Sequence, residues 1–360
     1  WRGVGILIDN ASLEREWIMK LRNERFPKRD PGIIEKAIYA LTLLERLSER
    51  QLHFVFKGGT SLILVLDEFN RFSIDIDIVT GVNQKELQRS LADIANNEPF
   101  TRFEVDVRNS KLEIPKSHYK FYYSSNVKGR EDYVLLDALH EEAAYPVLVE
   151  RKIDHFILIH TNNSASQEVL TPDVDCLLGD KLTAFAPRTT GIDWSTDSSS
   201  GNDLKILKQI FDIGRLFDKM VKLGNVSETL RRVAAIESRY RGTEITAKEV
   251  LEDIFEAALL IGFRGLSDRE LYQLLLRGCT KLSNYIFTGR FVEADMILAA
   301  SKIAFLAVSL QKEAEGAGDI EITDEPIEIR SFSRLNRLRN INIKAFRLFK
   351  EAVLLREGAR

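Results

Sequence analysis

Asp75 and Asp77 alternate with isoleucines in the run Ser73–Val79, which reads SIDIDIV. A period of two predicts a β-strand whose isoleucines face a core and whose two carboxylates share the other face. Like charges this close raise each other's pKa values, and a bound cation removes that cost. Mg²⁺ or Mn²⁺ suits hard oxygen ligands and keeps coordination positions for substrate phosphates. The pair therefore predicts a divalent-metal site for phosphoryl displacement, although two solvated aspartates on an edge strand would give the same pattern.

A glycine pair, Gly58-Gly59, precedes this strand by a helix-length spacer. Glycine lets the backbone approach a phosphate closely. The amides of Thr60 and Ser61 would point toward an anion at the start of the following helix, and the Ser61 hydroxyl would add a donor. Lys57 precedes the glycines, so the run is not a Walker A loop, and it is not GxGxxG either. A phosphate-binding turn followed by a metal pair is what a nucleoside triphosphate site requires.

The chain before residue 171 combines the helix and strand signals that would position these residues. Asp30-Pro31 predicts the start of an amphipathic helix over Ile33–Leu47, and Asn83 predicts the cap of a helix that ends near Asn96. The further predicted elements are a helix within 11–26, a helix at 60–66 capped by Gly59 or Thr60, strands at 54–56, 103–107, 118–123, 133–139, 145–153 and 156–160, and a hairpin turn at 126–131.

From residue 171 onward the pattern is helical. The predicted helices cover 171–187, 203–223, 228–238, 247–261, 267–277, 293–314 and 331–355. A polar, Ser-rich stretch at 189–202 predicts a loop. We therefore expect an α+β protein with two domains: a mixed-sheet core with N-terminal helices over 1–170, and a mainly helical domain over 171–360.

The bulk composition sets limits on the class of protein. The chain has 360 residues, a formal net charge of -3 and 44% hydrophobic residues, which is typical of a globular protein without a global attraction to polyanions. Cys176 and Cys279 lie far apart, which predicts buried free thiols rather than a disulfide or a zinc site. No run approaches the ~20 apolar residues of a membrane span, and the N-terminus shows no signal pattern. We expect a cytoplasmic protein without membrane contact.

The motifs resemble, in order, those of the AbiEii/AbiGii-type toxin nucleotidyltransferases, a branch of the DNA polymerase β-like superfamily. The resemblance lies within residues 33–220 and is carried by KGGTSL (57–62), RFSIDIDI (71–78), GDKLTAFAPR (179–188) and KQIFDIGRLFD (208–218). It implies a nucleotidyltransferase-like mixed sheet with flanking helices, and transfer of a nucleoside monophosphate (NMP) from an NTP to an acceptor. Many members are toxins of toxin–antitoxin or abortive phage-defence systems, and some modify transfer RNA. An antitoxin partner and an RNA acceptor are therefore expected.

The resemblance also implies site residues outside the aspartate pair. The superfamily uses a third carboxylate, for which Asp137 fits best, because a charge in an apolar strand is costly without a cation; Asp106 is the rival. This carboxylate would bind metal and act as general base. Lys181 would contact the triphosphate, unless it is a solvated helix lysine. Asp212 would be the catalytic partner of Lys181 or a structural residue.

Other candidate residues carry weaker signals. Lys57 and Arg71 flank the nucleotide motif and would contact phosphate or lie at the surface. Trp194 would stack on a base or pack locally. The five histidines show no metal-ligand spacing, and we expect them to play ordinary roles.

The acceptor is the least constrained part of the prediction. Basic clusters at 231–232, 239–241 and 330–350 would grip RNA phosphates or form solvated helix faces. An RNA-directed nucleotidyltransferase toxin is the leading hypothesis. The alternatives are a nucleotidyltransferase directed at a protein or small molecule, a kinase with the same metal chemistry, and a catalytically silent binding protein on the same fold.

Overall fold

The computed structural model describes residues 8–50, 52–68, 70–107, 114–161, 167–195, 202–287, 289–314 and 329–358. The chain divides into two compact units. The first comprises Trp1–Asp173 and Asn284–Gly289, and the second comprises Val174–Ser283 and Arg290–Arg360. Of the predicted loop at 189–202, residues 196–201 lie outside the described ranges.

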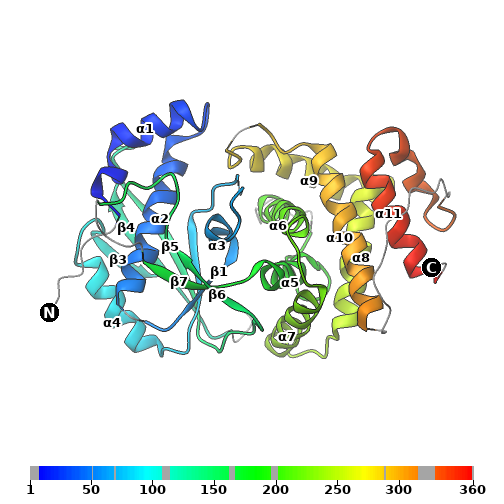
Figure 1. Ribbon diagram of the computed structural model, residues 1–360, viewed down its shortest axis with the longest axis horizontal. Helices are drawn as coiled ribbons and strands as arrows, with labels where there is room; N and C mark the ends of the chain where they lie inside the picture. Colours follow the sequence, from blue (N-terminus) through cyan, green and yellow to red (C-terminus); the bar gives the residue numbers. More distant parts are fainter. Residues whose placement is uncertain are drawn as a thin grey trace. The chain divides into compact units, whose positions relative to one another are not determined.

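The first unit is built on a mixed sheet that confirms the predicted α+β fold. Within the described ranges its seven strands follow the order β3-β4-β5-β2-β1-β7-β6 (Figure 1). Their bounds are β1 Val55–Lys57, β2 Asp75–Val79, β3 Arg102–Val105, β4 Lys116–Ser124, β5 Glu131–Leu139, β6 Leu148–Lys152 and β7 Glu168–Pro172. β2 runs parallel to β5, and β1 runs parallel to β7. The other neighbouring pairs are antiparallel. In this order β2 is the central strand and lies between β1 and β5.

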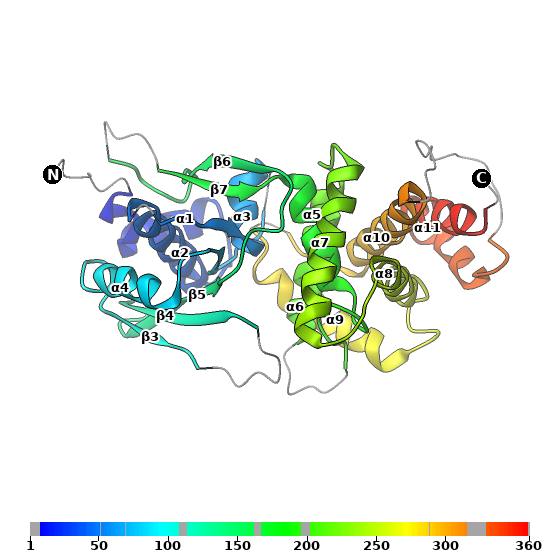
Figure 2. The ribbon, with the colours of Figure 1, turned by 90° about the horizontal axis from the view of Figure 1, so that it is seen from below.

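Helices of the first unit pack on the sheet, and most of them close its core on one face. Their bounds are η1 Asn10–Leu13, α1 Arg15–Glu24, α2 Pro31–Glu49, α3 Gly58–Val65 and α4 Gln84–Ala95. α2 packs against β2, β5 and α4 (Figure 2). Alternate residues of β4, Tyr119, Phe121 and Tyr123, are buried on this face, and Tyr123 stacks on Tyr39 of α2 with ring centroids 3.6 Å apart. The opposite face of these two strands carries Lys116, His118 and Lys120 of β4 and Glu131 and Asp137 of β5.

Local signals set the starts of α2 and α4, as predicted. The Asp30 side chain accepts a hydrogen bond of 2.8 Å from the Gly32 amide, and Pro31 is the first helical residue. The Asn83 side chain accepts a hydrogen bond of 3.0 Å from the Glu86 amide. Both caps satisfy amides that have no acceptor within their own helix.

The predicted strand at 156–160 is wrong, because residues near the N-terminus donate hydrogen bonds to the backbone carbonyl oxygens of this stretch. The Trp17 indole donates to the carbonyl oxygen of Ile157 at 2.8 Å, and the Asp9 amide donates to that of Ile159 at 2.8 Å. The segment therefore forms turns against η1 and α1 in place of a sheet strand.

Two further elements differ from the prediction. β7 was not expected, because a run of five residues ending at Pro172 forms a strand only through its pairing with distant β1 and β6. The single helix predicted at 331–355 is wrong, since η2 (Ser333–Asn340) and α11 (Ile343–Arg356) are separate. The Asn342 side chain accepts a hydrogen bond of 3.1 Å from the Ala345 amide and so begins a new helix.

The second unit is helical. Besides η2 and α11, its helices are α5 Val174–Phe185, α6 Asn202–Phe217, α7 Leu223–Arg241, α8 Ala247–Gly262, α9 Arg269–Ser283 and α10 Glu293–Ala314. α5 packs against α6 and α7, and α10 packs against α8 and α11. Cys176 and Cys279 are free and buried, as predicted. None of the helices in the described part of the chain has the length and apolar character needed to cross a membrane.

A short segment between α9 and α10 belongs to the first unit. The Phe72 amide donates to the carbonyl oxygen of Tyr285 at 2.8 Å, and the Phe287 amide donates to that of Asn70 at 2.8 Å. The Phe287 ring packs against Phe72, with centroids 4.5 Å apart. These contacts hold the segment beside the residues that lead into β2.

Candidate active site

β2 carries the two aspartates that the sequence singles out. Ile76 and Ile78 are buried in the core, while Asp75 and Asp77 are half-buried. This alternation confirms the predicted strand with its inward isoleucines. The two carboxylates therefore lie on the same side of the sheet.

Asp77 lies between a lysine and a third aspartate across the sheet. It is in register with Lys57 of β1 on one side and with Asp137 of β5 on the other. Adjacent strands are about 4.8 Å apart, so residues in register are close neighbours on one face. The fold therefore brings Asp75, Asp77 and Asp137 together, although Asp137 follows the pair by about sixty residues in sequence.

Neighbouring acidic and basic residues shift the pKa of Asp77 in opposite directions. Burial, together with the negative charges of Asp137 and Asp75, raises the pKa of Asp77 to about 6, against the lowering effect of Lys116 and Lys57. The ionised form of Asp77 is therefore disfavoured in the protein alone. A bound cation would relieve this cost.

Gly58 brings the turn after β1 against Asp77. Its φ is +80°, in the left-handed region that favours glycine. A Cβ at this position would overlap the Asp77 carboxylate and lie 2.8 Å from its Cγ. The aspartate thus points at the glycine turn, as a joint metal and phosphate site requires.

α3 begins directly at this turn. Its N-cap is Lys57, whose side chain makes no capping hydrogen bond, so the predicted cap at Gly59 or Thr60 is wrong. The positive φ of Gly58 lets the chain enter the helix immediately after the strand. The amides of the first helical turn have no acceptor within the helix, and they point outward where they suit an anion.

The two hydroxyl residues of the motif are buried and tie α3 in place. Thr60 Oγ1 donates to the carbonyl oxygen of Asp75, and Ser61 Oγ donates to that of Gly58 at 2.9 Å. These bonds fix the helix start to β2 and to its own turn. In this arrangement the backbone amides are the donors that the turn presents to a phosphate.

Asp137 is held by two basic residues of β4 that sequence reasoning missed. His118 Nδ1 lies 2.7 Å from Asp137 Oδ1, and Lys116 Nζ lies 3.9 Å from Asp137 Oδ2. His118 is also the register partner of Asp137. The signal lay in the predicted hairpin turn at 126–131, because a tight turn fixes which residues of its two strands face each other.

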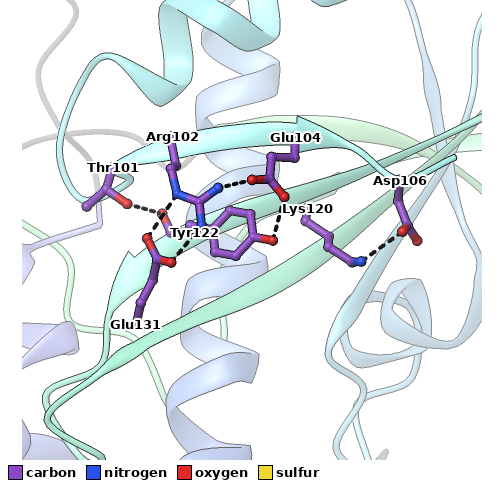
Figure 3. Close-up of polar contacts among 7 residues, drawn as sticks. All are labelled: Thr101, Arg102, Glu104, Asp106, Lys120, Tyr122 and Glu131. Atoms are coloured by element: carbon purple, nitrogen blue, oxygen red, sulfur yellow. Dashed lines mark hydrogen bonds and ion pairs between the residues drawn. The ribbon is translucent and has the colours of Figure 1, made fainter.

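The rival carboxylate, Asp106, lies away from the aspartate pair. Lys120 Nζ donates to Asp106 Oδ1 at 2.8 Å on the polar face of β3 and β4 (Figure 3). Two strands, β4 and β5, separate β3 from β2. Asp106 therefore belongs to a ladder of cross-strand ion pairs, and Asp137 is the aspartate adjacent to Asp77.

The flanking cations take different positions. Lys57 Nζ lies 5.7 Å from the centre of the Tyr145 ring. Arg71 is 1% exposed, and its Nη1 donates to the carbonyl oxygen of Phe72 at 2.9 Å. Burial raises the pKa of Tyr285, and the charge of Asp75 adds to the rise while Arg71 opposes it. Tyr285 and Arg71 thus form the surroundings of Asp75, and sequence reasoning missed Tyr285 because only the returning segment brings it there.

Lys181 and Asp212 belong to the second unit, on α5 and α6. Lys181 Nζ lies 2.9 Å from Asp212 Oδ2. Lys181 is 7% exposed and Asp212 is fully buried. The lysine is therefore not a solvated helix residue, and the ion pair expected between the two is present.

The remaining candidates are engaged in local contacts. Trp194 is buried and packs edge-on against Phe185, with ring centroids 5.1 Å apart, which matches the local-packing alternative. Arg231 and Arg232 both form ion pairs with Glu228. Further cations of the basic clusters are also engaged: Arg241 donates to the carbonyl of Thr190, Arg334 donates to that of Leu266, and Lys350 pairs with Glu351 inside the unit.

The residues around Asp77 fit a metal ion that takes only one or two ligands from the protein. In the ranges that the structure describes, no group of three or more His, Cys, Asp or Glu side chains is arranged to hold a metal ion. Mg²⁺ commonly takes one or two protein carboxylates and completes its shell with water and substrate phosphates. Asp75 and Asp77, with their clustered charge, match that smaller ligand set.

Comparisons with known proteins identify relatives. A family model described as "Nucleotidyl transferase AbiEii toxin, Type IV TA system" matches residues 42–284. Among solved structures, the chain is similar to JHP933 from Helicobacter pylori, with 14% identity, a TM-score of 0.44, and coverage of 78% of this chain and 94% of that one. It is also similar to an antigenic nucleotidyltransferase-like protein from Paracoccidioides brasiliensis, with 15% identity, a TM-score of 0.35, and coverage of 58% and 89%. No curated protein matches the chain. The family match spans the glycine turn, all three aspartates, Lys181 and Asp212.

Proposed function

Because the chain belongs to the AbiEii family of nucleotidyltransferase toxins of type IV toxin–antitoxin systems, we propose that it transfers an NMP from an NTP to an RNA acceptor. The reaction depends on a divalent metal at Asp75 and Asp77. The observation that carries the proposal is the position of Asp77, which lies against Gly58 and in register with Asp137. That position joins a phosphate-binding turn to a cluster of carboxylates.

Asp75 and Asp77 would hold Mg²⁺ or Mn²⁺, with Asp137 as the third carboxylate. When bound, the metal would offset the negative charge of the triphosphate and of the leaving pyrophosphate. The raised pKa of Asp77 supports this assignment. Burial and the neighbouring aspartates make the ionised carboxylate of Asp77 unfavourable, and a bound cation would stabilise it. The amides at the start of α3 would hold the phosphates beside the aspartates.

Asp137 would act as general base on the acceptor. It would take the proton of the acceptor hydroxyl, whose oxygen would then form a bond to the α-phosphorus of the NTP. The bond between the α-phosphorus and the bridging oxygen of the β-phosphate would break, and pyrophosphate would leave. Lys181, held by Asp212, is the residue expected to contact the triphosphate, as the resemblance to the family implies.

The family supports a toxin with an antitoxin partner, and some members of the wider group act on transfer RNA. The basic clusters of the second unit support an RNA acceptor less than their sequence suggested. Several of their cations form ion pairs within the protein, and one of these pairs is buried. The acceptor therefore needs its own test.

The acceptor test uses the purified chain with each α-³²P-labelled NTP, Mg²⁺, and either total RNA or total protein. We expect label in RNA with the wild type and none with Asp75→Asn. Label in protein alone would contradict an RNA acceptor while keeping the nucleotidyltransferase reaction. Label in both fractions would call for purified transfer RNA as the deciding substrate.

A further inference from the structure

His118 occupies a defined place on the polar face of β4. Its neighbours on β4, Ser117 and Tyr119, are buried on the other face, while His118 and Asp137 have side chains that are 16% and 17% exposed. The two residues are in register on antiparallel strands. The histidine ring therefore lies directly across from the carboxylate, and both side chains are partly exposed.

The contact between them is directional. His118 Nδ1 and Asp137 Oδ1 are 2.7 Å apart, which is the length of a strong charge-assisted hydrogen bond. A carboxylate oxygen accepts a hydrogen bond from an imidazole N–H, and on that ground we assign Nδ1 as the donor. Lys116 Nζ lies 3.9 Å from Oδ2, beyond hydrogen-bond length, and contributes charge without fixing direction. Fixing Oδ1 sets the direction in which Oδ2 points.

Other polar pairs on this face show what an ordinary contact looks like. Lys120 bonds Asp106, and Tyr122 bonds Glu104, at the edge of the sheet (Figure 3). Glu104 lies on the edge strand β3, and Asp106 directly follows that strand. The partner of His118 differs, because it is the aspartate in register with Asp77.

We propose that His118 is a positioning residue, which holds Asp137 in the orientation that takes the proton of the acceptor hydroxyl. The inference rests on the proposed nucleotidyltransferase function and assigns His118 no direct contact with substrate. It explains why a histidine faces the third carboxylate of the site.

The test compares two substitutions of nearly equal shape. His118→Asn keeps an N–H donor near the place of Nδ1, whereas His118→Leu removes it. We expect His118→Leu to lower kcat about 10- to 100-fold, as loss of an orienting partner commonly does. His118→Asn should restore a large part of that loss. The KM for NTP, measured by initial-rate kinetics, should stay within about threefold of wild type, because Asp75, Asp77 and the glycine turn are intact.

His140→Leu is the matched control. His140 makes two contacts close to the same strands, 3.1 Å from Ser117 Oγ and 2.9 Å from the carbonyl oxygen of Val82, and it lies outside the site. Its loss should lower the melting temperature more than kcat. If His118→Leu does not fold, His118→Ala serves as the second variant without a donor.

The outcomes separate the two proposals. Wild-type kcat in His118→Leu, or equal loss in the Asn and Leu variants, overturns the role of His118 alone. A drop in kcat for His140→Leu as large as for His118→Leu overturns it as well, since packing would then explain both. A wild-type chain that transfers no NMP to any acceptor overturns the proposed function and this inference together.

Discussion

At the scale of single residues, the site places three aspartates so close together that their repulsion lowers the free energy of unfolding. Asp77 faces Asp137 across the sheet and shares its face with Asp75, and its pKa is raised to about 6. Positions that lower stability and have no packing role point to function. The free energy of unfolding and the rate of transfer should therefore respond in opposite directions when this carboxylate is neutralised.

Asp77→Asn should abolish NMP transfer and raise the stability of the metal-free chain at neutral pH. Because the folded pKa lies above the ordinary value of 3.8, the folded state keeps a proton that the unfolded state releases. Stability therefore falls as pH rises from about 4 through about 6, by up to about 3 kcal/mol. Thermal denaturation should show a higher melting temperature for the variant at pH 7.5 and little difference at pH 4. A marked loss of stability at pH 7.5 would instead make Asp77 a structural residue.

Gly58→Ala should damage the site through geometry. The added methyl group meets the Asp77 carboxylate, and the residue has a φ of +80°, so both the turn and the aspartate must shift. A displacement of about 1 Å in a catalytic group costs on the order of 100-fold in rate. The transfer assay should show a loss of that size. Gly81→Ala is the control, since a Cβ there would have no neighbour within 4 Å, and a similar loss in both variants would contradict the account.

At the scale of elements, the parts with local signals were predictable. α2 and α4 have side-chain caps, β2 has strict alternation, and the turn between β4 and β5 contains Gly129 with a φ of +63°. β7 depends on distant strands, so its short sequence gave no signal. The same limit applies inside the site: the aspartate pair was predictable from one strand, whereas His118 required the register of two strands and Tyr285 required the return of a remote segment.

A buried acid on α2 allows a test of one element by pH. Glu45 is 1% exposed and accepts a hydrogen bond of 3.2 Å from the Ile8 amide. Burial raises the pKa of Glu45 to about 7, with a further rise from Glu49 and opposing effects from the Ile8 amide and Arg46. The stability of the chain should therefore decrease as pH rises from about 4.5 through about 7.

Glu45→Gln should remove that decrease. Relative to wild type, the variant should gain up to about 3 kcal/mol at pH 8.5 and almost nothing at pH 4.5, as measured by urea denaturation. Glu49→Gln leaves Glu45 buried and should keep most of the decrease, because burial is the largest cause of the raised pKa and Glu49 adds only a smaller rise. Parallel pH profiles for Glu45→Gln and wild type would show that Glu45 is not protonated in the folded chain.

At the scale of the whole molecule, the expected site residues are divided between two units. The aspartates and the glycine turn belong to the first unit, and the Lys181–Asp212 pair belongs to the second. The domain boundary at residue 170 was predicted only from the change between mixed helix and strand patterns and purely helical patterns in the sequence. The return of Asn284–Gly289 to the first unit had no local signal, because hydrogen bonds to 70–72 define it.

The Lys181–Asp212 pair can be tested by separating stability from nucleotide binding. Asp212→Ala leaves a buried lysine without this partner and should cost about 3–5 kcal/mol. The double variant Lys181→Met with Asp212→Leu should unfold near the wild-type midpoint, because replacing both members of a buried pair is often neutral. If Lys181 contacts the triphosphate, the KM for NTP should rise about 10- to 100-fold in the double variant. A wild-type KM would assign the pair to structure alone.

The position of the label in the NTP tests the central claim most directly. The wild-type chain is incubated with acceptor RNA, Mg²⁺ and the same NTP labelled at either the α- or the γ-phosphorus, with Asp77→Asn in parallel. NMP transfer predicts that the α-label enters the acceptor while the γ-label is released as pyrophosphate, and that both signals vanish in the variant. Entry of the γ-label into the acceptor would reveal a kinase, and transfer that persists in Asp77→Asn would contradict the assignment of the aspartate pair.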